Sequence, residues 1–383
     1  MINVGIIGTG FIGPAHIEAL RRVGNINVVA ICGATSLSAQ QDAAKLNVPF
    51  AFSNVAEFLQ HNGLDAVHNC TPNYLHAEIN RQILRAGKHV FSEKPLCLSM
   101  EEARELVELA GQAGVVHGVS FVYRQFAMVQ QAASMMRKGE AGRLFSVHGG
   151  YLQDWMLEET DYNWRVDADK GGVSRAVADI GSHWCDTVQF VTGKKIVAVM
   201  ADLATVWPTR RASVGASATF GAQHAETHYE TRKVTTEDMG FVLFRFEDGS
   251  KGCFSVSQVS AGRKNRLSFE LNGSRASVAW DQETPQQLWI GHRHQPNQIL
   301  TDDPSLLNRD IAGHARFPGG HIEGWPDAFR NMMQKFYQAV EQGKPPARGE
   351  ASFATFYEGA QVMSIVNAII TSHQQQRWVN VLP

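Results

Sequence analysis

Apolar and polar positions in the first third of the chain alternate between short apolar runs and helical patterns. Residues 4–7 (VGII) lead into GTGFIG at 8–13, and Pro14 then suits the first turn of a helix. The order of strand and helix repeats up to about residue 122. Strands are predicted at 27–32, 64–69, 88–91 and 115–121, and helices at about 37–46, 74–86 and 99–113. This alternation predicts an α/β fold with a doubly wound parallel sheet.

The pattern changes after residue 122. Six strand-like segments follow, at 195–205, 238–247, 252–259, 265–271, 275–280 and 286–291, together with helical patterns at 174–192, 326–342 and 351–372. Asp248-Gly249 and Asn272-Gly273 are hairpin signals, because the primed turns need positive φ. We therefore expect two domains: residues 1–122, and an α+β domain at 123–383 with a large, mostly antiparallel open sheet.

Composition narrows the class of protein. The 383 residues are 44% hydrophobic and 19% charged, which is typical of a soluble globular chain. Lys and Arg total 35 against 37 Asp and Glu, so we expect neither nucleic acid nor a membrane as partner. The five cysteines form no C-x-x-C pair, and the N-terminus has no basic leader, which indicates reduced thiols and a cytoplasmic location.

The glycine pattern Gly8-x-Gly10-x-x-Gly13 predicts a nucleotide cradle, because it follows a strand and opens a helix. Gly8 permits a tight turn, Gly10 lets a pyrophosphate approach the backbone, and Gly13 allows close helix packing. The helix N-terminus, with Phe11 and Ile12, adds N–H donors and a favourable dipole.

The end of the second strand bears on the choice between NAD and NADP. Residues 30–36 (AICGATS) contain no carboxylate for a ribose diol, and no Arg or Lys for a 2′-phosphate. Hydroxyl groups of Thr35 and Ser36 could serve a phosphate, which favours NADP slightly. Thr35 or Ser36 could equally be the cap of the next helix.

Two further segments carry candidate chemistry. Thr71-Pro72-Asn73 and Glu93-Lys94-Pro95 follow strands, and their position at strand ends predicts that they flank the nicotinamide half of a dinucleotide.

Asp179 and His183 are four residues apart in a helical pattern and share a face, which fits either a reactive pair or a solvated salt bridge. Gly181 between them suggests the close approach of a neighbour or ligand.

These motifs resemble the Gfo/Idh/MocA oxidoreductases over essentially the whole chain. The resemblance rests on GTGFIG, TPNYLH at 71–76, SEKPL at 92–96, and GG at 171–172 followed by DIGSH at 179–183. It implies a Rossmann domain that binds NAD or NADP, and a second domain for substrate binding and oligomerisation. It also implies a catalytic set of Lys94, His183 and Asp179, with Asn73, His76 and Glu93 near the cofactor and a cis peptide before Pro95.

The implied reaction is hydride transfer between a nicotinamide and a secondary hydroxyl of a sugar, sugar derivative or cyclic polyol. A neutral imidazole suits His183 as general base, and Lys94 would stabilise a developing alkoxide or share the proton transfer. Two alternatives remain: cleavage of glycosidic bonds by transient oxidation with tightly held NAD, and a dinucleotide-sensing regulator without enzyme activity.

Aromatic and charged side chains near these motifs are candidates for the sugar pocket. Ordinary loop packing is an equally good interpretation for each of them. His292-x-His294 has no third ligand, so no metal is expected. An exposed sheet face would support a homodimer or homotetramer. The substrate-binding candidates are Tyr123, Arg124, Trp155, Trp164, Arg165 and His321.

Overall fold

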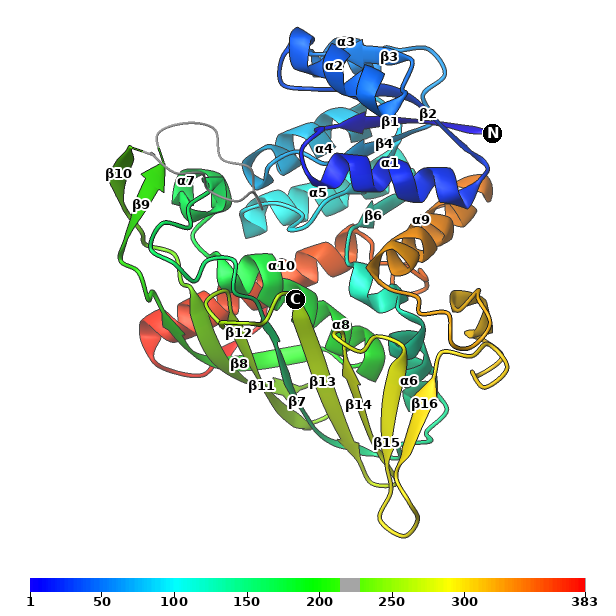
Figure 1. The fold of residues 1–383 in the computed structure, drawn as a ribbon, viewed down its shortest axis with the longest axis vertical. Coiled ribbons are helices and arrows are strands. Elements are labelled where there is room, and N and C mark those ends of the chain that lie inside the picture. Colours follow the sequence, from blue (N-terminus) through cyan, green and yellow to red (C-terminus); the bar gives the residue numbers. More distant parts are fainter. Residues whose placement is uncertain (214–227, 383) are drawn as a thin grey trace. The chain divides into compact units, whose positions relative to one another are not determined.

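The computed structural model describes residues 1–213 and 228–382 (Figure 1). The chain forms two compact units, each built from two stretches of sequence. Unit 1 comprises Met1–Gln125 and Trp325–Met363, and unit 2 comprises Phe126–Gly324 and Ser364–Pro383. The first stretch of unit 1 ends close to the expected boundary at residue 122. The second stretch differs from the expectation, which assigned it to the other domain.

The return of the chain to unit 1 has a packing reason. Helix α9 (Trp325–Glu341) is amphipathic and buries Phe329, Met332, Met333 and Phe336. Its ring contacts include Phe91 and His68 of the first sheet and His16 of helix α1 (Ile12–Val23). Amphipathic spacing predicts that a helix buries one face, but it does not say which surface receives that face.

Unit 1 contains a six-stranded sheet in the order β3-β2-β1-β4-β5-β6, and all of its strand pairs are parallel. The direction of the strand order reverses between β1 and β4. The predicted doubly wound fold is confirmed, with one additional edge strand, β3. The strands are β1 (Ile2–Ile7), β2 (Ile26–Cys32), β3 (Phe50–Phe52), β4 (Ala66–Asn69), β5 (His89–Ser92) and β6 (His117–Val119).

The helices of unit 1 are α1 (Ile12–Val23), α2 (Ser36–Leu46), α3 (Val55–Leu59), α4 (His76–Arg85), α5 (Met100–Ala113) and α9, with α10 (Phe356–Gln375) passing on into unit 2. Most of them begin close to the predicted positions, but α3 was not predicted and α10 begins five residues later than expected. None of the helices in the described part of the chain is both long and apolar enough to cross a bilayer.

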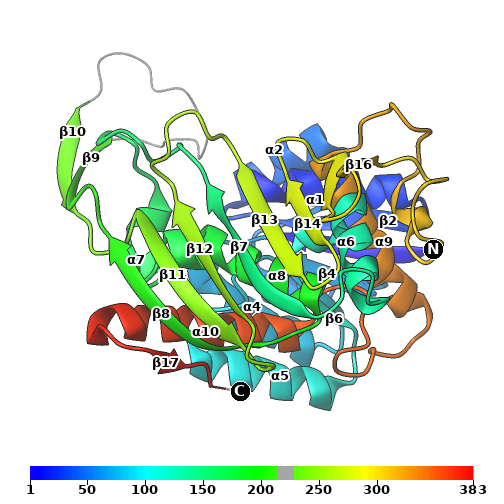
Figure 2. The same ribbon diagram turned by 90° about the horizontal axis from the view of Figure 1, so that it is seen from below.

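Unit 2 contains a nine-stranded sheet in the order β16-β15-β14-β13-β7-β12-β11-β8-β17 (Figure 2). Only β7 and β12 pair in parallel; the other pairs are antiparallel, as predicted. The strands are β7 (Leu144–Leu152), β8 (Ile196–Ala204), β11 (Met239–Phe246), β12 (Lys251–Ser257), β13 (Arg266–Gly273), β14 (Ser277–Asp281), β15 (Gln287–Gly291), β16 (Gln298–Thr301) and β17 (Val379–Asn380). A separate hairpin joins β9 (Thr209–Ser213) to β10 (Tyr229–Lys233).

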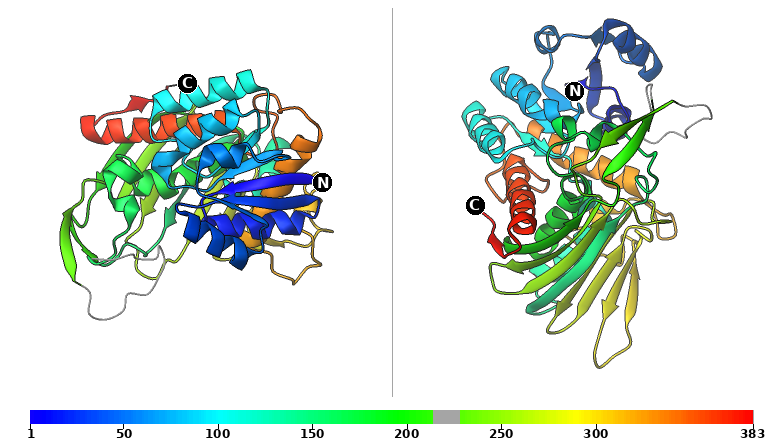
Figure 3. Two further views of the ribbon diagram at one scale, coloured as in Figure 1. Left: turned by 90° about the horizontal axis from the view of Figure 1, so that it is seen from above. Right: turned by 90° about the vertical axis from the view of Figure 1, so that its left-hand side faces the viewer.

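Within unit 2, helices pack on one face of this sheet, as the views in Figures 2 and 3 agree. They include α6 (Ala127–Arg137) and α8 (Ser182–Thr192). The opposite face presents large apolar side chains at alternate strand positions, such as Phe241 and Leu243 of β11. An apolar sheet face of this kind is suited to contact with another protein surface.

The helical segment predicted at 174–192 begins with a π-helical turn, η4 (Val177–Gly181), and continues as α8. Apolar residues recur at helical spacing along this segment and form a buried stripe. The stripe consists of Val177, Ile180, Trp184, Val188 and Val191. Asp179 and His183 therefore lie at the junction of the π-helical turn and the α-helix, a backbone irregularity that is frequent at functional sites.

Candidate active site

The glycine turn has the geometry of a nucleotide cradle. Gly8 adopts a φ of 96°, and a Cβ there would lie 2.5 Å from the carbonyl oxygen of Cys70. A Cβ on Gly13 would lie 2.3 Å from the carbonyl oxygen of Gly8. At Gly10 a Cβ would meet no described atom within 4 Å. The first and third glycines are thus required by close packing, and the space beside the second is open to a ligand.

Helix α1 begins directly behind this turn. Phe11 occupies the N-cap position without a capping side-chain hydrogen bond, and its side chain is exposed. Ile12 is the first helical residue. Backbone N–H groups at such a helix end attract an anion. Within the turn, the Thr9 hydroxyl donates to the carboxylate of Asp42 at 2.5 Å, which ties the turn to α2.

Of the two roles considered for Thr35, the structure shows the helix cap: Thr35 is the N-cap residue of α2. Its Oγ1 accepts a hydrogen bond from the N–H of Ser38 at 3.1 Å, and the Ser38 hydroxyl accepts from the N–H of Thr35. Ser36 is the first residue of α2 and is exposed. Thr35 is therefore explained by the helix end without a ligand.

His76 joins the two loops that follow β4 and β5. Its ring is buried, with Nε2 at 2.7 Å from the carbonyl oxygen of Thr71 and Nδ1 at 2.6 Å from that of Pro95. Burial lowers its pKa, partly opposed by these two carbonyl groups. Both ring nitrogens are thus engaged by the backbone, and His76 fixes the spacing of the loops that carry Asn73 and Lys94.

The Lys94–Pro95 peptide is cis, as the resemblance implied. Just before it, Glu93 is buried, and its Oε2 atom accepts the N–H of Lys94 at 3.1 Å. Burial alone would raise the pKa of Glu93, but hydrogen bonds from His16 and Ser120 and the charge of Lys94 help to lower it below its usual value. Glu93 is therefore an ionised carboxylate that holds the backbone of the lysine loop.

A line of buried side chains extends from the other oxygen of Glu93. Its Oε1 lies 3.0 Å from Nε2 of His16, the Nδ1 atoms of His16 and His68 are 2.7 Å apart, and Nε2 of His68 is 2.7 Å from the hydroxyl of Tyr337. We call Tyr337, His68, His16 and Glu93 the histidine chain. Its members come from α9, β4, α1 and the end of β5, so the whole histidine chain lies in unit 1.

In unit 2 the structure brings together four of the predicted residues. The carboxylate of Asp179 has Nε of Arg165 at 3.9 Å, and the guanidinium of Arg165 lies 4.4 Å from the ring centre of Trp164 and 5.9 Å from that of Trp155. A charged pair beside two aromatic faces is suited to binding a polyhydroxylated ring. Trp155 also donates through Nε1 to Gln153.

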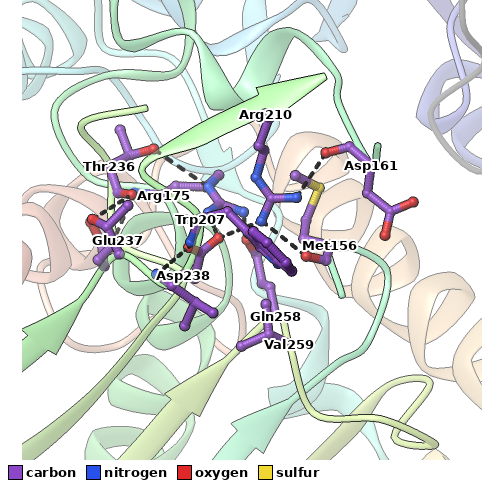
Figure 4. Close-up of polar contacts among 12 residues, drawn as sticks. Met156, Asp161, Arg175, Trp207, Arg210, Thr236, Glu237, Asp238, Gln258 and Val259 are labelled. Carbon is purple, nitrogen blue, oxygen red and sulfur yellow. Dashed lines mark hydrogen bonds and ion pairs between the residues drawn. The ribbon is translucent and has the colours of Figure 1, made fainter. Parts of the chain in front are cut away.

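Asp179 is held from behind by Gln258, whose Nε2 donates to Oδ2 of Asp179 at 3.0 Å and whose Oε1 accepts from Arg175 at 2.9 Å. Arg175 in turn pairs with Asp238, which also pairs with Arg210 at 2.7 Å (Figure 4). We call Arg175, Arg210, Asp238 and Gln258 the arginine cluster. The guanidinium groups and the Asp238 carboxylate are fully buried.

The arginine cluster also fixes the loop that displays Trp155. Arg210 donates to the backbone carbonyl oxygens of Met156, Glu158 and Asp161. Burial would raise the pKa of Asp238, but Arg175 and the N–H of Trp207 help to lower it below its usual value. The Asp238 carboxylate thus pairs with both buried guanidinium groups.

His183 is buried in the first turn of α8, and its ring centre lies 6.2 Å from that of Tyr151 on β7. The expectation of a close neighbour at Gly181 is not met by the protein. A Cβ there would meet its nearest described atom, of Val177, at 3.5 Å, which is an ordinary contact. Protein packing therefore does not explain this glycine.

Three further candidates for substrate binding lie in two turns of the chain. Tyr123 and Arg124 are buried in a short 3-10 turn of unit 1. His321 is in an exposed turn of unit 2, with its Nδ1 at 3.0 Å from the carbonyl oxygen of Pro318. Over residues 1–213 and 228–382, no group of three or more His, Cys, Asp and Glu side chains is placed to hold a metal ion.

Sequence reasoning missed the histidine chain and the arginine cluster. One local signal was present: His16 interrupts the buried stripe of α1 beside Ile17 and Leu20, and His68 interrupts an apolar strand. A polar side chain at a buried position requires a partner. Arg175 and Asp238 gave no comparable signal, because each stands where a solvated charge would be ordinary.

Two family models match this chain. The NAD-binding Rossmann-fold model of the GFO/IDH/MocA oxidoreductase family matches residues 2–121, and the GFO/IDH/MocA C-terminal domain model matches residues 129–279. The chain therefore belongs to the GFO/IDH/MocA oxidoreductase family.

Named relatives agree in length as well as in fold. The chain is 28% identical to levoglucosan dehydrogenase of Pseudarthrobacter phenanthrenivorans, over 99% of this chain and 98% of the relative. It is 31% identical to 1,5-anhydro-D-fructose reductase of Ensifer adhaerens, over 94% of each. An inositol dehydrogenase homologue from Azotobacter vinelandii, solved with NADH and myo-inositol, superimposes with a TM-score of 0.85 at 26% identity, covering 99% of this chain and 97% of that one.

Proposed function

We propose, from this family membership, that the protein transfers a hydride between a nicotinamide dinucleotide and a secondary hydroxyl of a sugar, sugar derivative or cyclic polyol. One observation carries the proposal. The turns at 8–13, 71–73 and 93–95 follow β1, β4 and β5, on both sides of the point where the strand order reverses. Ligands of doubly wound sheets bind in the crevice at that point.

The bound dinucleotide would supply the hydride acceptor, and side chains of this protein would manage the proton and the orientation of the substrate. Oxidation of an alcohol removes a hydride from carbon and a proton from oxygen. We assign that proton to His183 or Lys94, and we assign stabilisation of the developing alkoxide to the ammonium group of Lys94. Asp179 would orient a neighbouring hydroxyl. Asn73 and the backbone around Gly10 would contact the dinucleotide.

The substrate side is supported by Arg165. Its Nη1 atom is buried and has no hydrogen-bond acceptor among the described residues, while its guanidinium lies over Trp164. A buried donor of this kind calls for a partner, and a sugar hydroxyl would provide one. Trp155 and Trp164 would offer apolar ring faces to the C–H surface of the same sugar.

For the dinucleotide, we propose that the site accepts both NAD and NADP. Residues 33–38 contain no carboxylate to repel a 2′-phosphate and no Lys or Arg to attract one. This weakens the slight preference for NADP that the hydroxyl groups suggest, because Thr35 is already engaged as a helix cap. The five free thiols fit a cytoplasmic location.

We also propose that the protein is a homodimer or homotetramer, joined through the helix-free face of the nine-stranded sheet. Phe145, Phe241, Leu243 and Ile299 are all exposed. Large apolar side chains gathered on one sheet face favour burial against another protein surface. Sedimentation of a monomer at micromolar concentration would contradict this assignment.

The test is the absorbance of reduced nicotinamide with purified protein, NAD⁺ or NADP⁺, and a panel of sugars, anhydrosugars and inositols. We expect reduction with at least one substrate, similar kcat/KM for the two dinucleotides, and a loss of at least 100-fold in His183→Ala and Lys94→Ala. Cofactor binding without reduction by any substrate would contradict the dehydrogenase and favour redox-assisted glycoside cleavage or a sensor.

A further inference from the structure

The histidine chain has no role in the proposed chemistry, although it ends on the residue beside Lys94. His16 and His68 are completely buried, Tyr337 is 2% exposed and Glu93 is 8% exposed. The rings of Phe91 and Phe329 pack on His16 at 5.9 and 5.0 Å between ring centres. Polar groups in such surroundings are costly unless every donor meets an acceptor.

The ionised carboxylate at one end decides the direction of every bond. Glu93 has only acceptors to offer, so Nε2 of His16 must carry the proton that points toward it. A neutral His16 then has a bare Nδ1, which must accept from a protonated Nδ1 of His68. The Nε2 atom of His68 is in turn bare and accepts from the hydroxyl of Tyr337. All three bonds therefore point toward Glu93.

The same heavy-atom distances also permit an imidazolium at His16, with the bonds to His68 and Tyr337 reversed. In that arrangement the Tyr337 hydroxyl would accept from His68, and its own proton would need another acceptor. Among residues 1–213 and 228–382 the hydroxyl has only His68 as hydrogen-bond partner. A buried unsatisfied hydroxyl costs about 1–3 kcal/mol, so the neutral, one-way arrangement is favoured.

The histidine chain does not conduct protons to solvent. It ends at a buried tyrosine whose pKa is raised well above its usual value, mainly by burial and in addition by Asp65 and Cys70. Burial also lowers the pKa of His68, which favours a neutral imidazole there. The charged or titratable groups facing the histidine chain are Lys94, Cys70, His76 and Asp65. What remains for the chain is a positional role.

We propose that His16, His68 and Tyr337 are positioning residues for Lys94. Their one-way hydrogen bonds fix the Glu93 carboxylate, and Glu93 fixes the backbone N–H of Lys94 through its second oxygen. The role in catalysis rests on the function proposed above, because it requires Lys94 to act on the substrate. The protonation pattern itself does not depend on that function.

The first test is therefore spectroscopic. In protein labelled with ¹⁵N-histidine, long-range ¹H–¹⁵N correlations distinguish protonated from bare ring nitrogens. We expect a neutral Nε2–H tautomer for His16 and the less common Nδ1–H tautomer for His68 at neutral pH, assigned by the peaks that disappear in His16→Gln and His68→Gln. Tyr337→Phe should shift the His68 signals and release its tautomer. An imidazolium at His16, or Nε2–H at His68, would overturn the proposed direction.

The second test is kinetic and uses a conservative rescue. His16→Leu removes the donor to Glu93, and we expect kcat to fall about tenfold or more with the KM for the sugar little changed. His16→Gln places an amide N–H near the position of Nε2 and should recover most of that loss. The matched control is His117→Leu, a buried histidine on β6 that accepts from the N–H of Phe356 and does not contact Glu93.

The outcomes separate the two proposals. If His16→Leu and His117→Leu lose similar thermal stability and neither changes kcat, the histidine chain is structural only and the positioning role is wrong. If the wild-type protein reduces no dinucleotide with any substrate, the dehydrogenase assignment fails, whereas the tautomers of His16 and His68 still confirm or contradict the one-way chain.

Discussion

The histidine chain of unit 1 and the arginine cluster of unit 2 are both buried polar networks, and each ends at a proposed catalytic segment. They differ in the charge that they keep inside the protein. The histidine chain consists of neutral groups that end on one carboxylate, whereas the arginine cluster holds two permanent cations against Asp238. The former depends on tautomers and the latter on charge balance.

The difference predicts different weaknesses. A neutral network loses one hydrogen bond when a member is removed, which leaves a polar group unsatisfied at a cost of about 1–3 kcal/mol. A charged network loses its compensation, and an uncompensated buried charge costs about 3–5 kcal/mol. Substitution should therefore destabilise the arginine cluster more than the histidine chain. Acid should destabilise the histidine chain more than the arginine cluster.

The largest effect is expected from Asp238→Asn. This change leaves the buried Arg175 and Arg210 without their shared carboxylate, so the stability of unit 2 should fall by about 3–5 kcal/mol. Hydrogen exchange of amides in β11 and β12 under increasing urea measures it. The control is Asp248→Asn at the more exposed ion pair with Lys194, for which we expect no more than about 1 kcal/mol. Equal losses in the two variants would contradict the comparison.

The next largest effect is expected from acid, which should lower the stability of unit 1 before that of unit 2. Burial lowers the pKa of His117 in unit 1 to about 4, partly opposed by Glu358. A lowered histidine pKa contributes stability that is complete above the unfolded pKa of about 6.5 and is lost as pH falls toward 4, by about 3 kcal/mol. The lowered pKa of His68 acts in the same direction.

In unit 2 the signs differ. Burial raises the pKa of Glu237, so its contribution to stability increases as pH falls through that raised value toward the unfolded pKa of about 4.3. The lowered pKa of Asp238 contributes stability that is lost only as pH falls below about 4. Hydrogen exchange between pH 7 and 4 should therefore show unit 1 opening first. His117→Gln should flatten that pH dependence, and simultaneous opening of both units would contradict the prediction.

A smaller effect is expected where the arginine cluster meets Asp179. Gln258→Glu replaces the N–H that faces Asp179 with a second acceptor while it keeps the bond to Arg175. Repulsion should displace Asp179 and lower kcat/KM for the sugar about tenfold, or about 1.4 kcal/mol. Dinucleotide affinity, measured by nicotinamide fluorescence, serves as the internal control because Gln258 lies in unit 2. A loss of dinucleotide affinity alone would oppose this interpretation.

The smallest effect is expected at Gly181. Because a Cβ fits there in ordinary contact, Gly181→Ala should stabilise the helix by about 0.5–1 kcal/mol in urea unfolding. Gly193→Ala is the matched control on the same helix, since Gly193 has a φ of 67° and alanine would be strained. If Gly181→Ala also raises the KM for the sugar, the space beside Gly181 belongs to the substrate.

The sequence predicted what depends on local spacing. Most strands and helices of the two patterns, the buried stripe from Val177 to Val191 and the close packing at Gly8 and Gly13 are recovered, because side-chain period and backbone sterics act over a few residues. Strands β3, β7 and β16 and helices α3 and α6 were not predicted. At Gly249 the structure has the predicted positive φ of 84°. Gly273 instead closes β13, where a Cβ would lie 2.1 Å from the carbonyl oxygen of Ala141.

A helix cap shows a finer limit. Ser99 and Glu102 have the spacing of a capping box, and Ser99 accepts from the N–H of Glu102, but the Glu102 carboxylate accepts from the N–H of Leu98 rather than from that of Ser99. Local patterns could not predict the histidine chain or the arginine cluster, because their hydrogen bonds join residues that are far apart in the sequence. His68 meets Tyr337 from 269 residues away, and Asp179 meets Gln258 from 79 residues away. Spacing along a helix or strand carries no information about which distant side chain completes a buried bond.

The return of helix α9 to unit 1 has a consequence for biosynthesis. When Met1–Gln125 has emerged from the ribosome, all six strands of the first sheet have been synthesised. Tyr337, which ends the histidine chain, has not yet been made. Translation must pass through Phe126–Gly324 before Tyr337 emerges. The nascent Rossmann sheet therefore holds two buried imidazoles without their last donor until most of the polypeptide has been made, and its maturation is tied to late synthesis rather than to its own N-terminal position.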